Sequence, residues 1–394
     1  MIHIVRRLIE MVALVGTGAG VSYYVLSLWS AGAYLRYRGK VRSSTASQGD
    51  LPPVSILKPL KGVDPQIYEC FRSHCLQDYP EYEIIFGVSD ADDPAVHTVQ
   101  RLQREFPKCS IQLVVCSQKL GANTKVSNLV QMLRAARYDH LIVNDSDIRV
   151  GSDYLRRVIA PLSEEQVGMV TCLYRGIASG TLGSRLEAIG ISTDFSAGVL
   201  VARCIEAGVR FGLGSTLALR RGDLETIGGF EAFVDYLADD YELGKSIAGL
   251  GLEVCLSEAL VETVLPAYDL KGFLEHQLRW ARSVRDSRPW GYAGLLFTFG
   301  VPWAVLLVIA SRGAAWAWGL TAVVASLRLL MAWTVGNEVL RDRQLAALLP
   351  LLPLRDFAAV LVWLGSFAGN RIAWRGDYFR LKDGKLARVD PGNL

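Results

Sequence analysis

The sequence has no C-x-x-C pair, few histidines and almost no net charge. Its seven cysteines are unevenly spaced and only five histidines occur in 394 residues, so neither a zinc site nor a disulfide framework is indicated. The 42 basic and 39 acidic residues leave a formal charge of +3, too small for nucleic-acid binding through bulk charge. Hydrophobic residues make up 51% of the chain, which excludes a disordered protein and indicates that part of the chain lies in lipid.

A long apolar run near the N-terminus predicts a membrane anchor over residues 1–42. The segment from Leu8 to Leu35 carries one charged residue, Glu10, and is long enough to cross ~30 Å of hydrocarbon. We interpret it as a retained anchor because no clean small-residue cleavage site follows it, as a signal peptide would require. Four cations follow the run, and the positive-inside rule therefore predicts a cytoplasmic location for the next domain, at the inner membrane if the chain is bacterial.

Apolar segments return over residues 291–372 and predict a C-terminal membrane region. Residues 291–310 and 313–335 each predict one span. Residues 345–372 are interrupted by two prolines and an Arg-Asp pair, which indicates either a kinked span or a re-entrant hairpin. The basic tail, 373–394, favours the cytoplasm and with it the hairpin. The charges within these segments leave a transport pathway open as an alternative.

Between the membrane regions, residues 43–266 predict a cytoplasmic α/β domain that begins with a polar linker, 43–50. Apolar strands alternate with helical patterns, which is typical of a parallel, doubly wound sheet. Ligands of such sheets bind at the carboxyl ends of the strands, and acidic residues follow two of the strands predicted here. These strands cover residues 54–57, 82–88, 111–116 and 140–143.

Asp145 and Asp147 follow the last of these strands and give the sharpest chemical signal. Two carboxylates one residue apart can face one point in a turn, and their oxygens suit a hard cation such as Mg²⁺ or Mn²⁺. Such a cation can neutralise a diphosphate leaving group. A D-x-D tripeptide alone is weak evidence, and the alternative is a solvated turn.

Other candidate residues each have a plain structural alternative. Asp92 follows the second strand and could accept hydrogen bonds from a nucleotide, or it could cap the next helix. Lys125 lies at a loop-to-helix junction and could reach a phosphate, or the loop could be ordinary surface. Asp240 lies at the start of a predicted helix. It could act as a general base, or it could cap the helix, as its neighbour Asp239 could.

Two further stretches have the same ambiguity. The Gly-rich stretch 211–216 could allow close backbone approach to a sugar or acceptor, or form plain turns. Residues 267–290 predict a basic amphipathic helix with an arginine at every third position from 279 to 288. Such a helix lies in the membrane interface, where it contacts anionic lipid or a diphosphate.

Taken together, these motifs resemble the ceramide glucosyltransferase family, which has a GT-A nucleotide-diphospho-sugar transferase fold. The resemblance runs nearly end to end and is nearest to bacterial members, some linked to hopanoid biosynthesis. Its residues are V-S-I-L-K-P-L-K-G-V-D-P (54–65), D-Y-P-E-Y-E-I-I-F-G-V (78–88), D-A-D-D-P-A (90–95), N-D-S-D-I-R-V (144–150), A-D-D-Y (238–241), L-R-W (278–280) and W-R-G-D-Y (374–378).

The resemblance also implies roles for single residues. Asp92 would contact uridine, Asp145 would hold the metal with Asp147 completing the motif, and Asp240 would be the catalytic base. The family's (Q/R)-x-x-R-W motif ends on Arg279 and Trp280, which with Lys125 would bind the nucleotide sugar, but its first residue is His276 here.

The function implied is an inverting, metal-assisted transfer of glucose or N-acetylglucosamine from a UDP-sugar to a hydroxyl of a membrane lipid, either ceramide or a hopanoid. The competing hypotheses are a processive polysaccharide synthase, a polyprenyl-phosphate sugar transferase, and a non-catalytic membrane scaffold or lipid transporter. A polymer product would decide for the first, little effect of losing the base would indicate the second, and a lack of UDP-sugar turnover would indicate the third.

Overall fold

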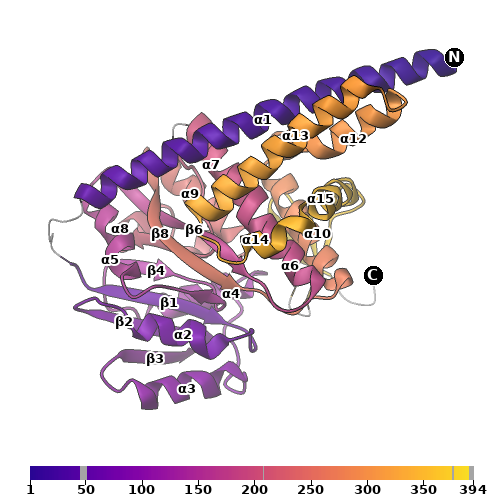
Figure 1. Ribbon diagram of the computed structural model, residues 1–394. Helices are drawn as coiled ribbons and strands as arrows, with labels where there is room; N and C mark the ends of the chain where they lie inside the picture. The colour runs from indigo at the N-terminus through magenta and orange to yellow at the C-terminus, as the bar shows by residue number, and fades with distance from the viewer. Residues whose placement is uncertain (45–50, 207, 375–376, 390–394) are drawn as a thin grey trace. The chain divides into compact units, whose positions relative to one another are not determined.

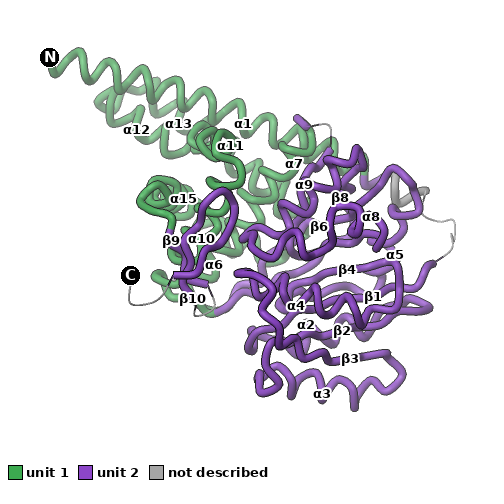
Figure 2. Tube along the Cα trace, turned by 180° about the vertical axis from the view of Figure 1, so that it is seen from behind, with its two compact units in different colours: residues 1–37, 180–204, 267–370 green, residues 38–179, 205–266, 371–394 purple. Residues whose placement is uncertain are grey.

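A computed structural model of the chain describes residues 1–44, 51–206, 208–374 and 377–389. Most of the predicted linker and part of the W-R-G-D-Y motif therefore lie outside the described residues. The chain forms two compact units, each assembled from separate stretches (Figure 2). Unit 1 comprises residues 1–37, 180–204 and 267–370, and unit 2 comprises residues 38–179, 205–266 and 371–394.

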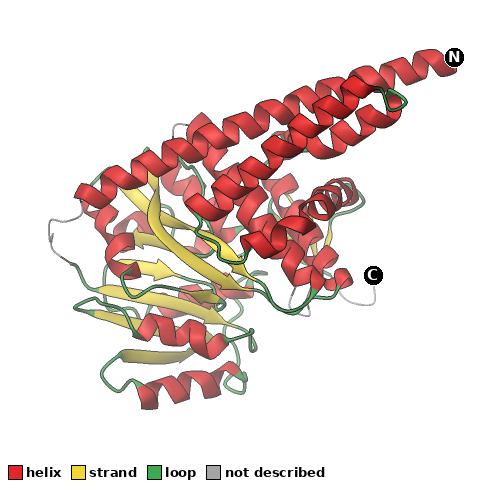
Figure 3. Cartoon of the chain, in the orientation of Figure 1, coloured by secondary structure: helices red, strands yellow, loops and turns green. Residues whose placement is uncertain are grey.

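Unit 2 contains every strand of the described chain. Figure 3 draws these strands in yellow. Its main sheet has eight strands in the order β3-β2-β1-β4-β7-β6-β8-β5. The first four pair in parallel, as the alternating pattern predicts, but β7 is antiparallel to β4 and makes the sheet mixed. The strands are β1 (Val54–Leu60), β2 (Tyr82–Val88), β3 (Ser110–Val115), β4 (His140–Val143), β5 (Ile148–Arg149), β6 (Val167–Ile177), β7 (Leu217–Arg220) and β8 (Glu253–Val264).

Amphipathic helices cover this sheet because each presents one apolar stripe to it. In α3, for example, the buried residues Val96, Val99 and Leu102 recur at helical spacing. The helices of unit 2 are α2 (Ile67–Cys75), α3 (Ala95–Glu105), α4 (Thr124–Leu133), α5 (Tyr154–Ile159), η1 (Ala160–Ser163), α8 (Arg221–Thr226), η3 (Phe230–Phe233) and α9 (Asp239–Gly249).

The basic tail forms a small antiparallel sheet, which sequence analysis did not predict. Its strands alternate, with Phe379 and Leu381 buried beside exposed neighbours, and they pack around an apolar cluster that includes Leu237. The strands are β9 (Arg371–Trp374), β10 (Asp377–Lys382) and β11 (Lys385–Arg388).

Unit 1 is helical. In Figure 1, α1 lies beside α12 and α13, and Ala13, Leu307 and Ala317 form their shared core. The helices of unit 1 are α1 (Ile2–Ser44, to residue 37), α6 (Leu182–Gly190), η2 (Ile191–Phe195), α7 (Ser196–Ile205), α10 (Leu270–Ser287), α11 (Pro289–Gly294), η4 (Leu295–Thr298), α12 (Gly300–Ala310), α13 (Ala315–Trp333), η5 (Thr334–Val339), α14 (Leu345–Leu348), η6 (Leu349–Leu351) and α15 (Leu352–Ser366).

Small residues allow α1 and α12 to approach closely. Gly16 and Gly20 lie four residues apart, and a Cβ atom added to either would come within 2.3 Å of Trp303 or Gly300. Small residues at this spacing are typical of helices that associate in membranes, where close backbone contact replaces the hydrophobic driving force.

Four helical runs in the described residues are long and apolar enough to cross a membrane: Ile2–Gly39, Leu182–Ile205, Ala315–Val339 and Leu345–Ser366. A fifth is formed if Pro289–Thr298 and Gly300–Ala310, which are bent by 53°, count as one broken span. The segment predicted as a kinked span or hairpin is thus a single helical run from Leu345. Its two prolines lie in the first turns of η6 and α15. Backbone N–H groups in a first turn have no partner within the helix, so the N–H that proline lacks is not needed there.

Candidate active site

Asp145 lies at the point where the strand order of the sheet reverses. It directly follows β4, which pairs with β1. Open α/β sheets bind their ligands at such a reversal point, beyond the carboxyl ends of the strands. From β1, the fully buried Lys58 donates through Nζ to the carbonyl oxygen of Asp145 at 2.9 Å. Burial lowers the pKa of Lys58 to about 8, although nearby carboxylates oppose this shift.

Lys125 joins Asp145 to the start of α9. Its Nζ lies 2.8 Å from Asp145 Oδ1 and 3.1 Å from Asp239 Oδ2. Burial by itself would lower the pKa of Lys125, but the carboxylates of Asp145, Asp239 and Asp240 together raise it. Lys125 is therefore a fixed positive charge among these carboxylates.

The loop before Lys125 is held in place by the segment that leads into α9. Asn123 caps α4 by accepting from the N–H of Val126, and its amide donates to the carbonyl oxygen of Tyr236 at 2.7 Å. Gly121 packs so closely against Val234 that a Cβ atom would come within 2.6 Å of it. These contacts fix the backbone from which Lys125 reaches the carboxylates.

Asp145 and Asp240 face the same point beside the Gly-rich stretch. A Cβ atom at Gly214 would lie 3.1 Å from Asp145 Oδ2 and 3.1 Å from Asp240 Oδ2, so the missing side chain leaves space between two carboxylates. Burial, and then the charge of Asp239, raises the pKa of Asp240 to about 6. A carboxyl group with such a pKa can accept a proton near neutral pH.

Asp147 has different surroundings from Asp145. Its Oδ2 accepts a hydrogen bond from the hydroxyl of Thr263 on β8. Burial, and then the charge of Asp145, raises the pKa of Asp147 to about 6. Asp147 is thus tied to the sheet, whereas the side chain of Asp145 is 38% exposed.

Asp93 and Asp92, in the acidic turn after β2, have different surroundings. Asp93 accepts hydrogen bonds from the backbone N–H groups of Gly62, at 2.9 Å, and Ala95, also at 2.9 Å, so it fastens the loop after β1 to the start of α3. The side chain of Asp92 is exposed, which leaves it accessible to a ligand.

The motif residues of α10 belong to unit 1. His276 Nδ1 lies 2.9 Å from Oε1 of the buried Glu187, and its ring stacks on Tyr268 with centroids 5.4 Å apart. Trp280 contacts the rings of His276 and Phe195. Arg279 lies on the same helix and is partly buried.

The structure brings in residues that sequence analysis passed over. Lys58 and Thr263 both contact the predicted acidic residues. The signal for Lys58 was a lysine directly after an apolar stretch. Sequence analysis ended that strand at Leu57, three residues too early, because it continues to Leu60. Thr263 carries no comparable signal, since its partner lies 116 residues away.

A divalent cation at Asp145 and Asp147 would need further ligands from a bound molecule. The described residues contain no group of three or more side chains that could by itself hold a metal. Mg²⁺ is commonly bound through one or two carboxylates together with substrate phosphates, which Asp145 and Asp147 could provide in part. The ammonium group of Lys125 on Asp145 shows that this carboxylate accommodates a positive charge.

Comparisons with known proteins give a consistent assignment. Ceramide glucosyltransferase 3 of Caenorhabditis elegans is 27% identical over 273 residues, covering 69% of this chain and 58% of the relative. Ceramide glucosyltransferase 1 of the same organism is 28% identical over 208 residues, covering 52% of this chain and 44% of the relative. The chain thus spans about half the length of these two relatives.

A solved structure shares the fold. The mannosyltransferase PcManGT from Pyrobaculum calidifontis, solved with GDP-Man and Mn²⁺, superposes with a TM-score of 0.52 at 19% identity, over 90% of this chain and 99% of that chain. This likeness supports the GT-A fold expected from the sequence. The family model of glycosyl transferase family 21 matches residues 12–387, nearly the whole sequence, and the chain therefore belongs to that family.

Proposed function

We propose that this chain transfers glucose or N-acetylglucosamine from a UDP-sugar to a hydroxyl group of a membrane lipid, either ceramide or a hopanoid, with inversion at the anomeric carbon. Family membership and the names of the ceramide glucosyltransferase relatives support the reaction class. Apolar helices that could cross a membrane support a lipid acceptor. We further propose that unit 2 faces the cytoplasm, where soluble nucleotide sugars occur.

The observation that carries this proposal is the pair of carboxylates at Gly214. Displacement of a diphosphate by a hydroxyl requires a positive charge at the leaving group and a base at the nucleophile. Asp145 and Asp240 provide one carboxylate for each task, and both face the space that Gly214 leaves open.

The proposed roles follow from charge and position. Asp145 and Asp147 would hold a divalent cation, as Mn²⁺ in the mannosyltransferase of similar fold suggests, and such a cation would supply Lewis-acid chemistry toward the diphosphate. Asp240 accepts the proton of the attacking hydroxyl, and Lys125 adds positive charge beside Asp145.

The remaining predicted binding residues act on the donor. Asp92 would accept hydrogen bonds from uridine. His276, Arg279 and Trp280 would contribute to binding the nucleotide sugar, a role assigned from their motif.

The test is transfer from labelled UDP-glucose and UDP-N-acetylglucosamine to lipid in membranes that contain the full chain. Ceramide and a polyhydroxylated hopanoid serve as acceptors. Asp240→Asn should abolish transfer and retain donor binding, because the amide keeps the shape but cannot accept the proton. Asp139→Asn is the matched control, since the side chain of Asp139 is 85% exposed in the same unit.

The other outcomes separate the alternatives. Label in a water-soluble polymer would identify a processive synthase. If transfer persists in Asp240→Asn, Asp240 is not the base, and Asp239 becomes the first candidate. No label in any product of the wild-type chain would contradict the proposed reaction.

A further inference from the structure

The C-terminal sheet, formed by β9, β10 and β11, is hydrogen-bonded to the segment of unit 2 that leads into α9. The N–H of Leu386 on β11 donates to the carbonyl oxygen of Asp235 at 2.7 Å, and the N–H of Leu237 donates to the carbonyl oxygen of Gly384 at 3.1 Å. The side chain of Leu237 also packs in the apolar cluster of this sheet. The C-terminal sheet therefore holds the backbone of residues 234–237.

The same segment is also hydrogen-bonded to the loop before Lys125. The N–H of Ala122 donates to Oδ1 of Asp235 at 2.8 Å, and the N–H of Asn123 donates to the carbonyl oxygen of Val234 at 2.7 Å. Asp235 thus accepts from two directions, because its side chain accepts from the loop and its carbonyl oxygen accepts from the C-terminal sheet. One residue links three segments that are far apart in the sequence.

These links set the distance between two charged parts of the candidate active site. Lys125 is the second residue of α4, just after the loop, and Asp239 and Asp240 are the first residues of α9, just after the segment. The ammonium group of Lys125 lies 3.1 Å from the carboxylate of Asp239. A displacement of about 1 Å in an active site can cost about 100-fold in rate, so the two segments must keep their separation.

We propose that Asp235 is a positioning residue of the transfer reaction and that the C-terminal sheet takes part in this role. Asp235 holds the start of α9, and with it the proposed base Asp240, in place relative to Lys125. The C-terminal sheet in turn holds Asp235 through Leu386 and acts on the reaction through that segment. This inference rests on the proposed function, because it concerns the base of that reaction.

The first test compares two substitutions of Asp235 in the full chain. Asp235→Ala removes the acceptor, whereas the amide oxygen of Asp235→Asn can still accept from the N–H of Ala122. We expect kcat to fall by at least about tenfold in Asp235→Ala, with a smaller change in the KM of the donor, and to recover in Asp235→Asn. Expressing kcat per chain that binds labelled UDP-sugar removes the contribution of misfolded protein.

Asp153→Ala is the matched control, because it makes the same substitution elsewhere in unit 2. The carboxylate of Asp153 lies 2.6 Å from Nη2 of Arg157, four residues further along the chain, and its side chain is 54% exposed. Exposed pairs of this kind contribute little, so kcat should stay within about twofold of the wild-type value.

The second test concerns the C-terminal sheet and uses two glycines. Gly384 and Gly251 both have left-handed backbone, with φ of +76° and +82°, so alanine strains both positions alike. A Cβ atom at Gly384 would lie 3.3 Å from the ring of Tyr236, but at Gly251 it would meet nothing within 4 Å. Gly384→Ala should therefore lower kcat by at least about threefold more than Gly251→Ala does.

Amide hydrogen exchange gives a measurement that does not depend on sugar transfer. Exchange at the N–H groups of Ala122 and Leu237 should be faster in Asp235→Ala than in the wild-type chain, because the segment loses its hold on the loop. Asp235→Asn should keep both amides protected. In Gly384→Ala the amide of Leu237 should exchange faster, since its acceptor is the carbonyl oxygen of Gly384.

The results separate this inference from the proposed function. An unchanged kcat in Asp235→Ala, a loss that Asp235→Asn does not restore, or equal losses in Gly384→Ala and Gly251→Ala would overturn the positioning role while the function stands. If the wild-type chain transfers no sugar, the proposed function fails. Faster exchange at Ala122 in Asp235→Ala would then still support the hold of Asp235 on the loop.

Discussion

At the residue scale, Lys125 balances the carboxylates that meet at its ammonium group. Replacing it by methionine keeps the length of the side chain but leaves Asp145 and Asp239 without their partner. Removing one partner of a buried ion pair typically costs about 3 kcal/mol or more. We expect Lys125→Met to lower the thermal unfolding midpoint by several degrees, measured on the detergent-solubilised chain.

Lys245→Met is the control for this change. Lys245 pairs with Glu242 in the same unit, but its side chain is 56% exposed. An exposed pair contributes less than about 1 kcal/mol, so its loss should barely move the midpoint. Equal effects of the two variants would contradict the role assigned to Lys125.

Asp240 should make the proposed transfer depend on pH. Its pKa is raised to about 6, first by burial and then by Asp239, while Lys125 acts to lower it. Below pH 6 the carboxyl group is protonated and cannot accept a proton, so the transfer rate should rise with pH through about 6 and then level off.

Lys125→Met provides the internal check on this profile. Removing a positive charge that favours the ionised form should move the midpoint to higher pH. An unchanged profile in that variant would show that another group controls the rate.

Gly214 should be sensitive to the addition of a single methyl group. Gly214→Ala would place Cβ 3.1 Å from an oxygen of Asp145 and of Asp240, in the space proposed for the reacting groups. We expect the transfer rate to fall by at least about tenfold, since displacements near 1 Å in an active site can cost more than that. Gly222→Ala, with nothing within 4 Å of its Cβ position, should keep its activity.

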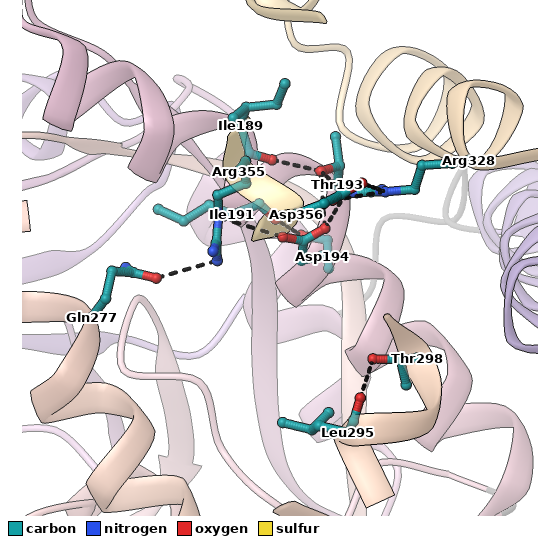
Figure 4. A network of polar contacts seen from close by, with 11 residues as sticks. Ile189, Ile191, Thr193, Asp194, Gln277, Leu295, Thr298, Arg328, Arg355 and Asp356 are labelled. Atoms are coloured by element: carbon teal, nitrogen blue, oxygen red, sulfur yellow. Dashed lines mark hydrogen bonds and ion pairs between the residues drawn. The ribbon is translucent and has the colours of Figure 1, made fainter. Parts of the chain in front are cut away.

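At the scale of elements, Arg328 fastens three helices of unit 1. It hydrogen-bonds Asp356 of α15 and Asp194 of η2, and its own helix is α13 (Figure 4). Arg328→Met should destabilise unit 1 by about 3–5 kcal/mol, because Asp356 loses the cation that it hydrogen-bonds and Asp194 keeps only Arg355. Loss of folded protein in a detergent-stability assay would show this, with the exposed Arg343→Met as the unaffected control.

The regularity of the apolar pattern decided which elements could be predicted from the sequence. Strands β2 and β4 have the predicted bounds, because each is a short apolar run with clear ends. The helical run Leu182–Ile205 was missed, since polar residues such as Glu187 and Asp194 interrupt its apolar pattern. Those residues are tolerated because α10, α13 and α15 bring them partners or cover them.

At the scale of the whole molecule, the proposed orientation can be tested by proteolysis. The cations after the N-terminal run predict that unit 2 faces the cytoplasm. Trypsin should therefore cleave exposed sites such as Lys119 and Arg104 in inside-out membrane vesicles and spare them in right-side-out vesicles. Cleavage in the right-side-out vesicles alone would reverse the orientation.

The sequence by itself determined the class of the protein: a parallel α/β core with acidic residues at its strand ends, flanked by apolar helices, with motifs of one glycosyltransferase family. These features are local, because periodicity and short motifs depend on neighbouring residues. Only the tertiary structure decided which residues meet. Asp145, Gly214 and Asp240 are distant in the chain and face one point, and Gly190 packs against Arg355 across more than 160 residues. Such contacts depend on packing between elements, which no local pattern records.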